Sequence, residues 1–189
     1  MNLSTEEITE EMLKVFSNYH DANKILINTW QDIIFLTPRW WVGVTLGLLP
    51  WILWVKFHNK KYTGDLIRAG LFMTVMSLIL DSLGVQLGLW LYPYDVLPFI
   101  PGYFPWDLTL LPISVMFLIE IKPKYSPLIK AVIFAALSAF IGETLATISN
   151  IYEPIHWNPF FSFPIYIVLF LLSNMIAKSK CFNTTFTAQ

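Results

Sequence analysis

Cysteine and histidine are scarce in this chain, and their scarcity excludes several kinds of site. Among 189 residues there is one cysteine, Cys181, and the three histidines are scattered as His20, His58 and His156. A single cysteine forms no intramolecular disulfide and no cysteine-rich metal site. The sequence also lacks a nucleotide motif, a Gly-rich phosphate loop and a nucleophile elbow, so we expect no metal centre and no cofactor.

Charged residues are few as well. They make up 13% of the chain, whereas a soluble domain of this size carries about 25%. Hydrophobic residues make up 56%, and aromatic residues, with eight tryptophans among them, make up 16%. This composition predicts an all-α integral membrane protein with tryptophans at the membrane–water interfaces. The net charge of −1 gives no basis for nucleic-acid binding.

Residues 1–36 predict an amphipathic surface helix. Ser4 and Glu7 have the spacing of a capping box, and apolar residues recur about every 3.6 positions from Ile8 to Ile33. Such a helix lies on the membrane surface or covers the helix bundle. The segment begins with acids rather than with a basic region and an apolar core, so we expect no cleavable signal peptide.

Five apolar segments follow and form a predicted membrane domain over residues 37–178. They lie at about 39–57, 66–89, 105–121, 127–148 and 160–177. Each approaches the roughly 20 residues that an α-helix needs to cross about 30 Å of hydrocarbon. The third segment is short and contains Pro112, so we expect it to be tilted or broken there.

Basic residues predict the orientation of these segments. Nine of the twelve lysines and arginines fall at 56–68, 122–130 and 178–180, whereas the loops at 90–104 and 149–159 contain none. Loops rich in lysine and arginine stay on the cytoplasmic side. The amino terminus is therefore predicted outside, and the tail at 179–189 in the cytoplasm.

Two acids lie within apolar segments, Asp81 in the second and Glu143 in the fourth. A charged side chain at membrane depth costs about 2.5–3.5 kcal/mol on insertion scales, so such an acid usually serves a function. Small and polar residues share the face of each acid, which predicts that both acids point into the bundle. These residues are Gly70, Thr74, Ser77, Gly84 and Gly88 in the second segment, and Ala136, Ala139, Ala146 and Asn150 in the fourth.

The two acids occupy matching places in a predicted internal repeat. Asp81 is followed nine residues later by Trp90, and Glu143 nine residues later by Tyr152. In each case an aromatic, proline-rich loop leads to a further apolar segment with its own proline. Two helix pairs inserted in the same direction, at about 66–121 and 128–178, make a parallel repeat.

These features predict a pocket that opens toward the outer leaflet, with acids at its floor and aromatic residues at its mouth. We expect Asp81, Glu143 and Asp107 to be its reactive acids. Its ligand-binding residues are predicted to be Trp90, Tyr92, Trp106, Tyr152, His156, Trp157 and Asn158. An acid that keeps its proton can act as a general acid, while an ionised neighbour and aromatic faces stabilise a cation. That combination suits isomerisation or cyclisation of a prenyl chain.

Other roles for the acids stay open on the sequence alone. Asp81 and Glu143 can hydrogen-bond to neighbouring helices and only hold the bundle together. They can also belong to a proton or ion path, although Glu120 is the only acid that continues such a path toward the inner surface. Asp107 stands at the start of a segment, where negative charge suits a helix N-terminus.

The chain resembles an uncharacterised family of small multi-pass proteins from spore-forming Gram-positive bacteria. The resemblance covers about residues 40–178 and is most specific in LPFIPG…PWDLTLLP. It implies a bacterial plasma membrane. A looser likeness is to membrane terpene cyclases of the lycopene-cyclase type, whose G-[IL]-W-x-Y element matches Gly88, Leu89, Trp90 and Tyr92. The paired acids that follow a proline in those cyclases are absent, so cyclase activity is an analogy.

Three functions therefore stay open on the sequence alone. The first is binding, with or without conversion, of an apolar lipid or isoprenoid. The second is a non-catalytic subunit that packs against a partner protein in a homo- or hetero-oligomer. The third is a small transporter. Membrane lipids are expected around the protein in each case.

Overall fold

A computed structural model describes residues 4–179 of the chain. The predicted tail lies, apart from Ser179, outside these residues, and so does Cys181. The elements are α1 (Thr5–Ile33), α2 (Pro38–Phe57), η1 (Lys60–Tyr62), α3 (Thr63–Gln86), β1 (Trp90–Leu91), η2 (Trp106–Leu110), α4 (Leu111–Glu120), α5 (Pro127–Ala136), η3 (Leu137–Gly142), α6 (Glu143–Ile148), β2 (Glu153–Pro154) and α7 (Pro159–Lys178).

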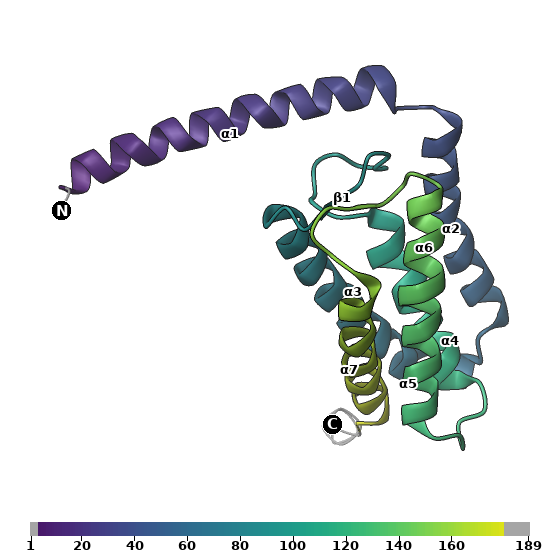
Figure 1. Ribbon diagram of the computed structural model, residues 1–189. Coiled ribbons are helices and arrows are strands. Elements are labelled where there is room, and N and C mark those ends of the chain that lie inside the picture. Colours follow the sequence, from purple (N-terminus) through teal and green to yellow (C-terminus); the bar gives the residue numbers. More distant parts are fainter. Residues whose placement is uncertain (1–3, 180–189) are drawn as a thin grey trace, which may run out of the picture.

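The all-α prediction is confirmed, and four helical segments are long and apolar enough to cross a membrane. They are Pro38–Phe57, Lys60–Gln86, Pro127–Ile148 and Pro159–Lys178. Their bounds lie within a few residues of four of the predicted segments, except that the second starts six residues earlier than predicted. These helices stand side by side as a bundle in Figure 1.

The third predicted segment, 105–121, is helical from residue 104 to residue 120, but it is not among the four helices long and apolar enough to cross a membrane. A π-helical stretch, η2, covers Trp106–Leu110, and α4 continues from Leu111 to Glu120. Pro112 stands in the first turn of α4 and lacks the N–H that would bond to the preceding turn. The carbonyls of Asp107 and Leu108 in that turn accept instead from the Ser77 hydroxyl and the Trp51 indole. The proline therefore marks the change from the wider π-helical turns to the α-helix rather than a break in the middle.

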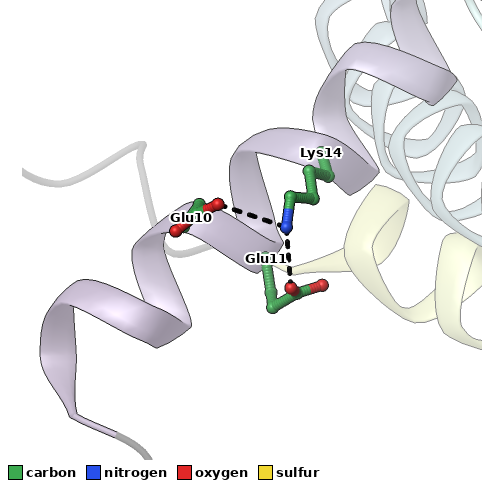
Figure 2. A network of polar contacts seen from close by, with 3 residues as sticks. All are labelled: Glu10, Glu11 and Lys14. Carbon is green, nitrogen blue, oxygen red and sulfur yellow. Dashed lines mark hydrogen bonds and ion pairs between the residues drawn. The ribbon is translucent and has the colours of Figure 1, made fainter.

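α1 begins with the predicted capping box and extends away from the bundle (Figure 1). The Glu7 N–H donates to the Ser4 hydroxyl, and the Ser4 N–H donates to the Glu7 carboxylate at 2.8 Å. Most apolar residues of α1 are exposed, and Trp30 is the one that is buried. On the polar face, Lys14 pairs with Glu10 and Glu11 (Figure 2). Exposed pairs of this kind contribute less than about 1 kcal/mol each.

Polar contacts assign the helix termini to two ends of the bundle. At one end the Asn59 N–H donates to Glu120, and Arg68 donates to the carbonyl of Ser179. The ends of α2, α4 and α7 and the start of α3 therefore lie together there. At the other end, the Trp30 indole donates to the carbonyl of Asp95. The chain thus passes back and forth between the two ends in five helical rods, which are α2, α3, η2 with α4, α5 to α6, and α7. The loops 87–105 and 149–158 lie at the end opposite Glu120.

α3 and α6 end in the same way, and the chain that follows one pairs with the chain that follows the other. At the end of α3, the N–H groups of Leu87, Gly88 and Leu89 donate to the carbonyls of Leu83, Val85 and Gly84, in that order. At the end of α6, the N–H groups of Ser149, Asn150 and Ile151 donate to the carbonyls of Leu145, Thr147 and Ala146, in that order. Each bond in α6 lies 62 positions after its counterpart. Gly88 and Asn150 both have positive φ, as residues that close a helix often do. In the β1–β2 pair, Leu91 lies opposite Glu153, also 62 positions later.

The main core lies between α3, α4, α5 and α7. Its fully buried members include Met73, Val115, Phe134 and Phe170. A second cluster, with Trp54 and Leu66, packs α2 against α3 and α4. Both clusters occupy the part of the bundle nearer the Glu120 end, so the other end is left to the loops and to the site described next.

Candidate functional site

A cavity of about 530 Å³ lies where α3 and α6 end. The predicted acids Asp81, Asp107 and Glu143 all line it. So do aromatic residues from the two loops and from η2 and α7, namely Trp90, Tyr92, Tyr103, Trp106, Tyr152, Trp157 and Tyr166. The remaining lining residues are small or aliphatic, apart from Ser77, Ser149 and Ser162. Ligand pockets commonly have this make-up, an apolar wall with a few placed polar groups.

Asp81 is the best-bonded acid of the three. Its Oδ1 accepts from the Trp90 indole N–H at 2.6 Å and from the Tyr92 hydroxyl at 2.7 Å. Its Oδ2 accepts from the backbone N–H of Tyr103 at 2.9 Å. Three donors to a carboxylate that is 6% exposed satisfy most of its hydrogen-bonding capacity. Asp81 thereby ties α3 to the beginning and the end of the loop 87–105.

Asp107 lies beside Asp81 because Gly102 lets the two approach each other. A Cβ at Gly102 would stand 2.9 Å from Oδ2 of Asp81 and 3.2 Å from Oδ2 of Asp107. Gly102 also has φ +134°, which favours glycine on its own account. Asp107 is 1% exposed, and its Oδ2 has no hydrogen-bond partner among the described residues. The expectation of a first-turn acid agrees with its position in η2, but its side chain lines the cavity.

Glu143 lines the cavity from the first position of α6. It is 8% exposed, and its Oε2 has no hydrogen-bond partner among residues 4–179. The hydroxyls of Ser162 and Tyr166 lie close to its carboxyl group. The Trp106 indole donates to the Tyr166 hydroxyl at 3.2 Å, which connects η2 with α7 behind the acid.

Asp107 and Glu143 are both placed at π-helical stretches. Asp107 is the second residue of η2, and Glu143 directly follows η3. A π-helical turn holds one extra residue, so it rotates the side chains that follow it relative to an α-helix. Such turns are rare and frequently occur at functional sites.

The predicted ligand-binding residues divide into two groups. Trp90, Tyr92, Trp106, Tyr152 and Trp157 line the cavity. His156 and Asn158 do not. The His156 side chain is exposed, while its backbone N–H donates to the carbonyl of Leu89. The Asn158 side chain accepts from the Phe160 N–H as the N-cap of α7.

Sequence reasoning missed two site residues on α7, Ser162 and Tyr166. Both line the cavity, and the Ser162 hydroxyl also accepts from the Trp157 indole at 2.8 Å. They are four positions apart and therefore share one face of α7. That spacing was a usable signal, because the rest of this segment is almost entirely apolar.

The cavity has an apolar opening at its side. Val42 of α2 and Leu145 of α6 line the cavity, yet they are 50% and 58% exposed. Leu83 and Leu87 of α3 also line the cavity and are 53% and 70% exposed, so the cavity meets the outside beside several helices. The part of this opening at Val42 and Leu145, here called the lateral mouth, lies on two of the helices that are apolar enough to cross a membrane.

Asp95, in the loop 87–105, makes the stability of the protein depend on pH. Burial raises the pKa of Asp95 from 3.8 to about 7, and Asp81 adds to that rise, while the N–H groups of Leu97 and Val96 oppose it. The folded state then holds a proton that the unfolded state releases above about pH 4, so stability falls as the pH rises from about 4 to 7.

We expect Asp95→Asn to remove this fall, with the two stability curves meeting near pH 4 and separating up to pH 7. Thermal unfolding in detergent across this range checks the prediction, and parallel curves would contradict it.

Within residues 4–179, no group of three or more His, Cys, Asp or Glu side chains is arranged to hold a metal ion. No family model, curated protein or solved structure matches the chain.

Proposed function

We propose that this is a plasma-membrane protein that crosses the bilayer five times, with its amino terminus outside and its carboxyl terminus in the cytoplasm. The alternation of the five rods between two ends supports this topology, and α4 with η2 is the shortest crossing. The basic residues at 56–68 and 122–124, together with Lys178, gather at the Glu120 end. Clustered lysine and arginine are typical of the cytoplasmic side. The cavity then belongs to the outer half of the membrane.

The parallel repeat is part of the same proposal. Its support is the identical bonding at the ends of α3 and α6 and the pairing of Leu91 with its counterpart Glu153. A residue paired with its own counterpart is expected on a two-fold axis. An axis along the membrane normal relates parallel repeats in membrane proteins.

The function that the site supports best is binding of an apolar lipid or isoprenoid within the cavity. The observation that carries this proposal is a pair of buried carboxyl oxygens, Oδ2 of Asp107 and Oε2 of Glu143, that belong to residues of the cavity lining and have no hydrogen-bond partner among the described residues. An unpaired buried polar atom costs about 1–3 kcal/mol, so proteins retain one where a ligand satisfies it. The lateral mouth supports an apolar ligand, because it gives access from lipid rather than from water. Isomerisation or cyclisation at the same acids is the reaction that such a ligand would undergo.

The structural alternative applies best to one acid. Asp81, with three donors, has the contacts of a residue that holds helices and loops together. A transporter is less well supported, because the fully buried apolar residues Met73, Val115, Phe134 and Phe170 lie between the cavity and Glu120. A polar path through the bundle would have to cross this packed layer.

Mass spectrometry of co-purifying lipids tests the proposal. We expect wild-type protein to retain a specific lipid that the double variant Asp107→Asn, Glu143→Gln loses, because both unpaired acceptors are altered while helix packing is kept. Glu153→Gln is the matched control, since Glu153 is exposed on β2 near the cavity but does not line it. The same bulk lipids with all three proteins would contradict a binding site.

A further inference from the structure

The chemistry of the lining also restricts the polar end of the ligand. Three carboxyl groups line the cavity, and none of the lysine, arginine or histidine side chains of the described residues does so. A phosphate, diphosphate or carboxylate head would meet like charge with no cation to offset it, which is unfavourable in a buried site. Anionic lipids and isoprenoid diphosphates are therefore poor ligands for this cavity.

The unpaired oxygens require hydrogen-bond donors. Oδ2 of Asp107 comes from η2, and Oε2 of Glu143 comes from the start of α6. An ammonium group supplies three donors and no acceptor, and it also carries the charge that offsets the carboxylates.

Aromatic rings complete a cation site around these acids. Trp106, Tyr152 and Tyr166 line the cavity together with Asp107 and Glu143. Aromatic faces attract cations, most strongly where water is excluded. Aliphatic residues of the lining, such as Leu145 and Val42, lie instead at the lateral mouth. The cavity thus has a largely apolar wall that is interrupted by a few acids and aromatic residues, and its opening at Val42 and Leu145 is apolar.

We propose that the ligand is a single-chain amphiphile with a protonated amine head. The inference rests on the lipid-binding function proposed above and specifies its ligand class. The head lies between Asp107 and Glu143, and the chain leaves through the lateral mouth between α2 and α6 into the outer leaflet. A volume of about 530 Å³ is within the range of about 300–1,000 Å³ that is typical of small-molecule sites. It holds the head and the first part of one chain.

Three probes that share one chain and differ only in the head test this inference. Dodecylammonium, dodecanol and dodecanoate are titrated into the full-length protein in a non-ionic detergent, and the fluorescence of the lining tryptophans reports binding. We expect dodecylammonium to bind at least tenfold more tightly than dodecanol, and dodecanoate to show no saturable binding. The comparison needs no variant, so it does not depend on the folding of a mutant.

Two variants then locate the site. Asp107→Asn with Glu143→Gln should weaken dodecylammonium binding at least tenfold, while Glu153→Gln, outside the lining, should leave the binding of both dodecylammonium and dodecanol unchanged. Dodecanol binding as tightly as dodecylammonium would overturn the amine head and leave the lipid-binding function intact. No saturable binding of any probe would overturn both. An equal effect of Glu153→Gln would reveal general attraction to an acidic surface and would overturn the site.

Discussion

Asp81→Ala lowers the free energy of unfolding by about 3 kcal/mol, the largest loss that we expect from any single acid of this protein. The change leaves three donors without their acceptor, namely the Trp90 indole, the Tyr92 hydroxyl and the Tyr103 N–H. Each hydrogen bond to a charged group contributes about 1.5–3 kcal/mol, and polar contacts in membrane proteins fall toward or below the lower end of that range. Unfolding of the detergent-solubilised protein measures the loss.

Glu143→Gln is the control for this prediction. Glu143 is buried to nearly the same extent as Asp81, but its Oε2 has no partner. We expect a change below about 1 kcal/mol, because an amide removes a buried charge without leaving three donors unpaired. Equal losses for the two variants would show that Asp81 does not hold the loops as described.

Gly84→Ala costs about 2 kcal/mol, because the added methyl group has no room. A Cβ at Gly84 would overlap the six-membered ring of Trp90. Overpacking of this kind typically costs about 1–3 kcal/mol. The ring can yield only by moving its N–H away from Asp81, so the variant also weakens one of the bonds described above. Unfolding in detergent measures the stability.

Gly47→Ala separates this clash from the intrinsic preference of helices for alanine. Gly47 is also inside a helix, α2, but a Cβ there would meet nothing within 4 Å. We expect it to be neutral or to gain up to about 1 kcal/mol, as glycine-to-alanine changes in helices do where space allows. A loss at Gly47 as large as that at Gly84 would mean that both helices need glycine for another reason.

The sequence was sufficient to predict the features that depend on helix periodicity and on the free-energy cost of placing an acid in lipid. Apolar runs near 20 residues predicted four helices to within a few residues, and the stripe that contains Gly84 predicted that Asp81 points into the bundle. Both follow from local rules, the spacing of side chains on a helix and the expense of a lipid-exposed acid.

The features that were not predicted depend on tertiary contacts. The approach of Asp107 to Asp81 depends on Gly102, which lies in a loop whose path is fixed by what it packs against. His156 and Asn158 were included because they are near other aromatic residues in the chain, but one side chain is exposed and the other caps α7. The π-helical turns of η2 were not predicted, because hydrophobicity does not reveal where a helix widens.

The lateral mouth decides how occupancy is to be counted. A ligand that arrives between Val42 and Leu145 comes from the bilayer, so the relevant concentration is its mole fraction among lipids rather than its molarity in water. A lipid present at about one molecule in a hundred half-fills the site with an interaction of only about 2.7 kcal/mol. The protein then needs no tight binding to remain loaded, and exchange with the surrounding leaflet stays fast. The fraction of protein with an occupied cavity would then follow changes in the lipid composition of the membrane quickly.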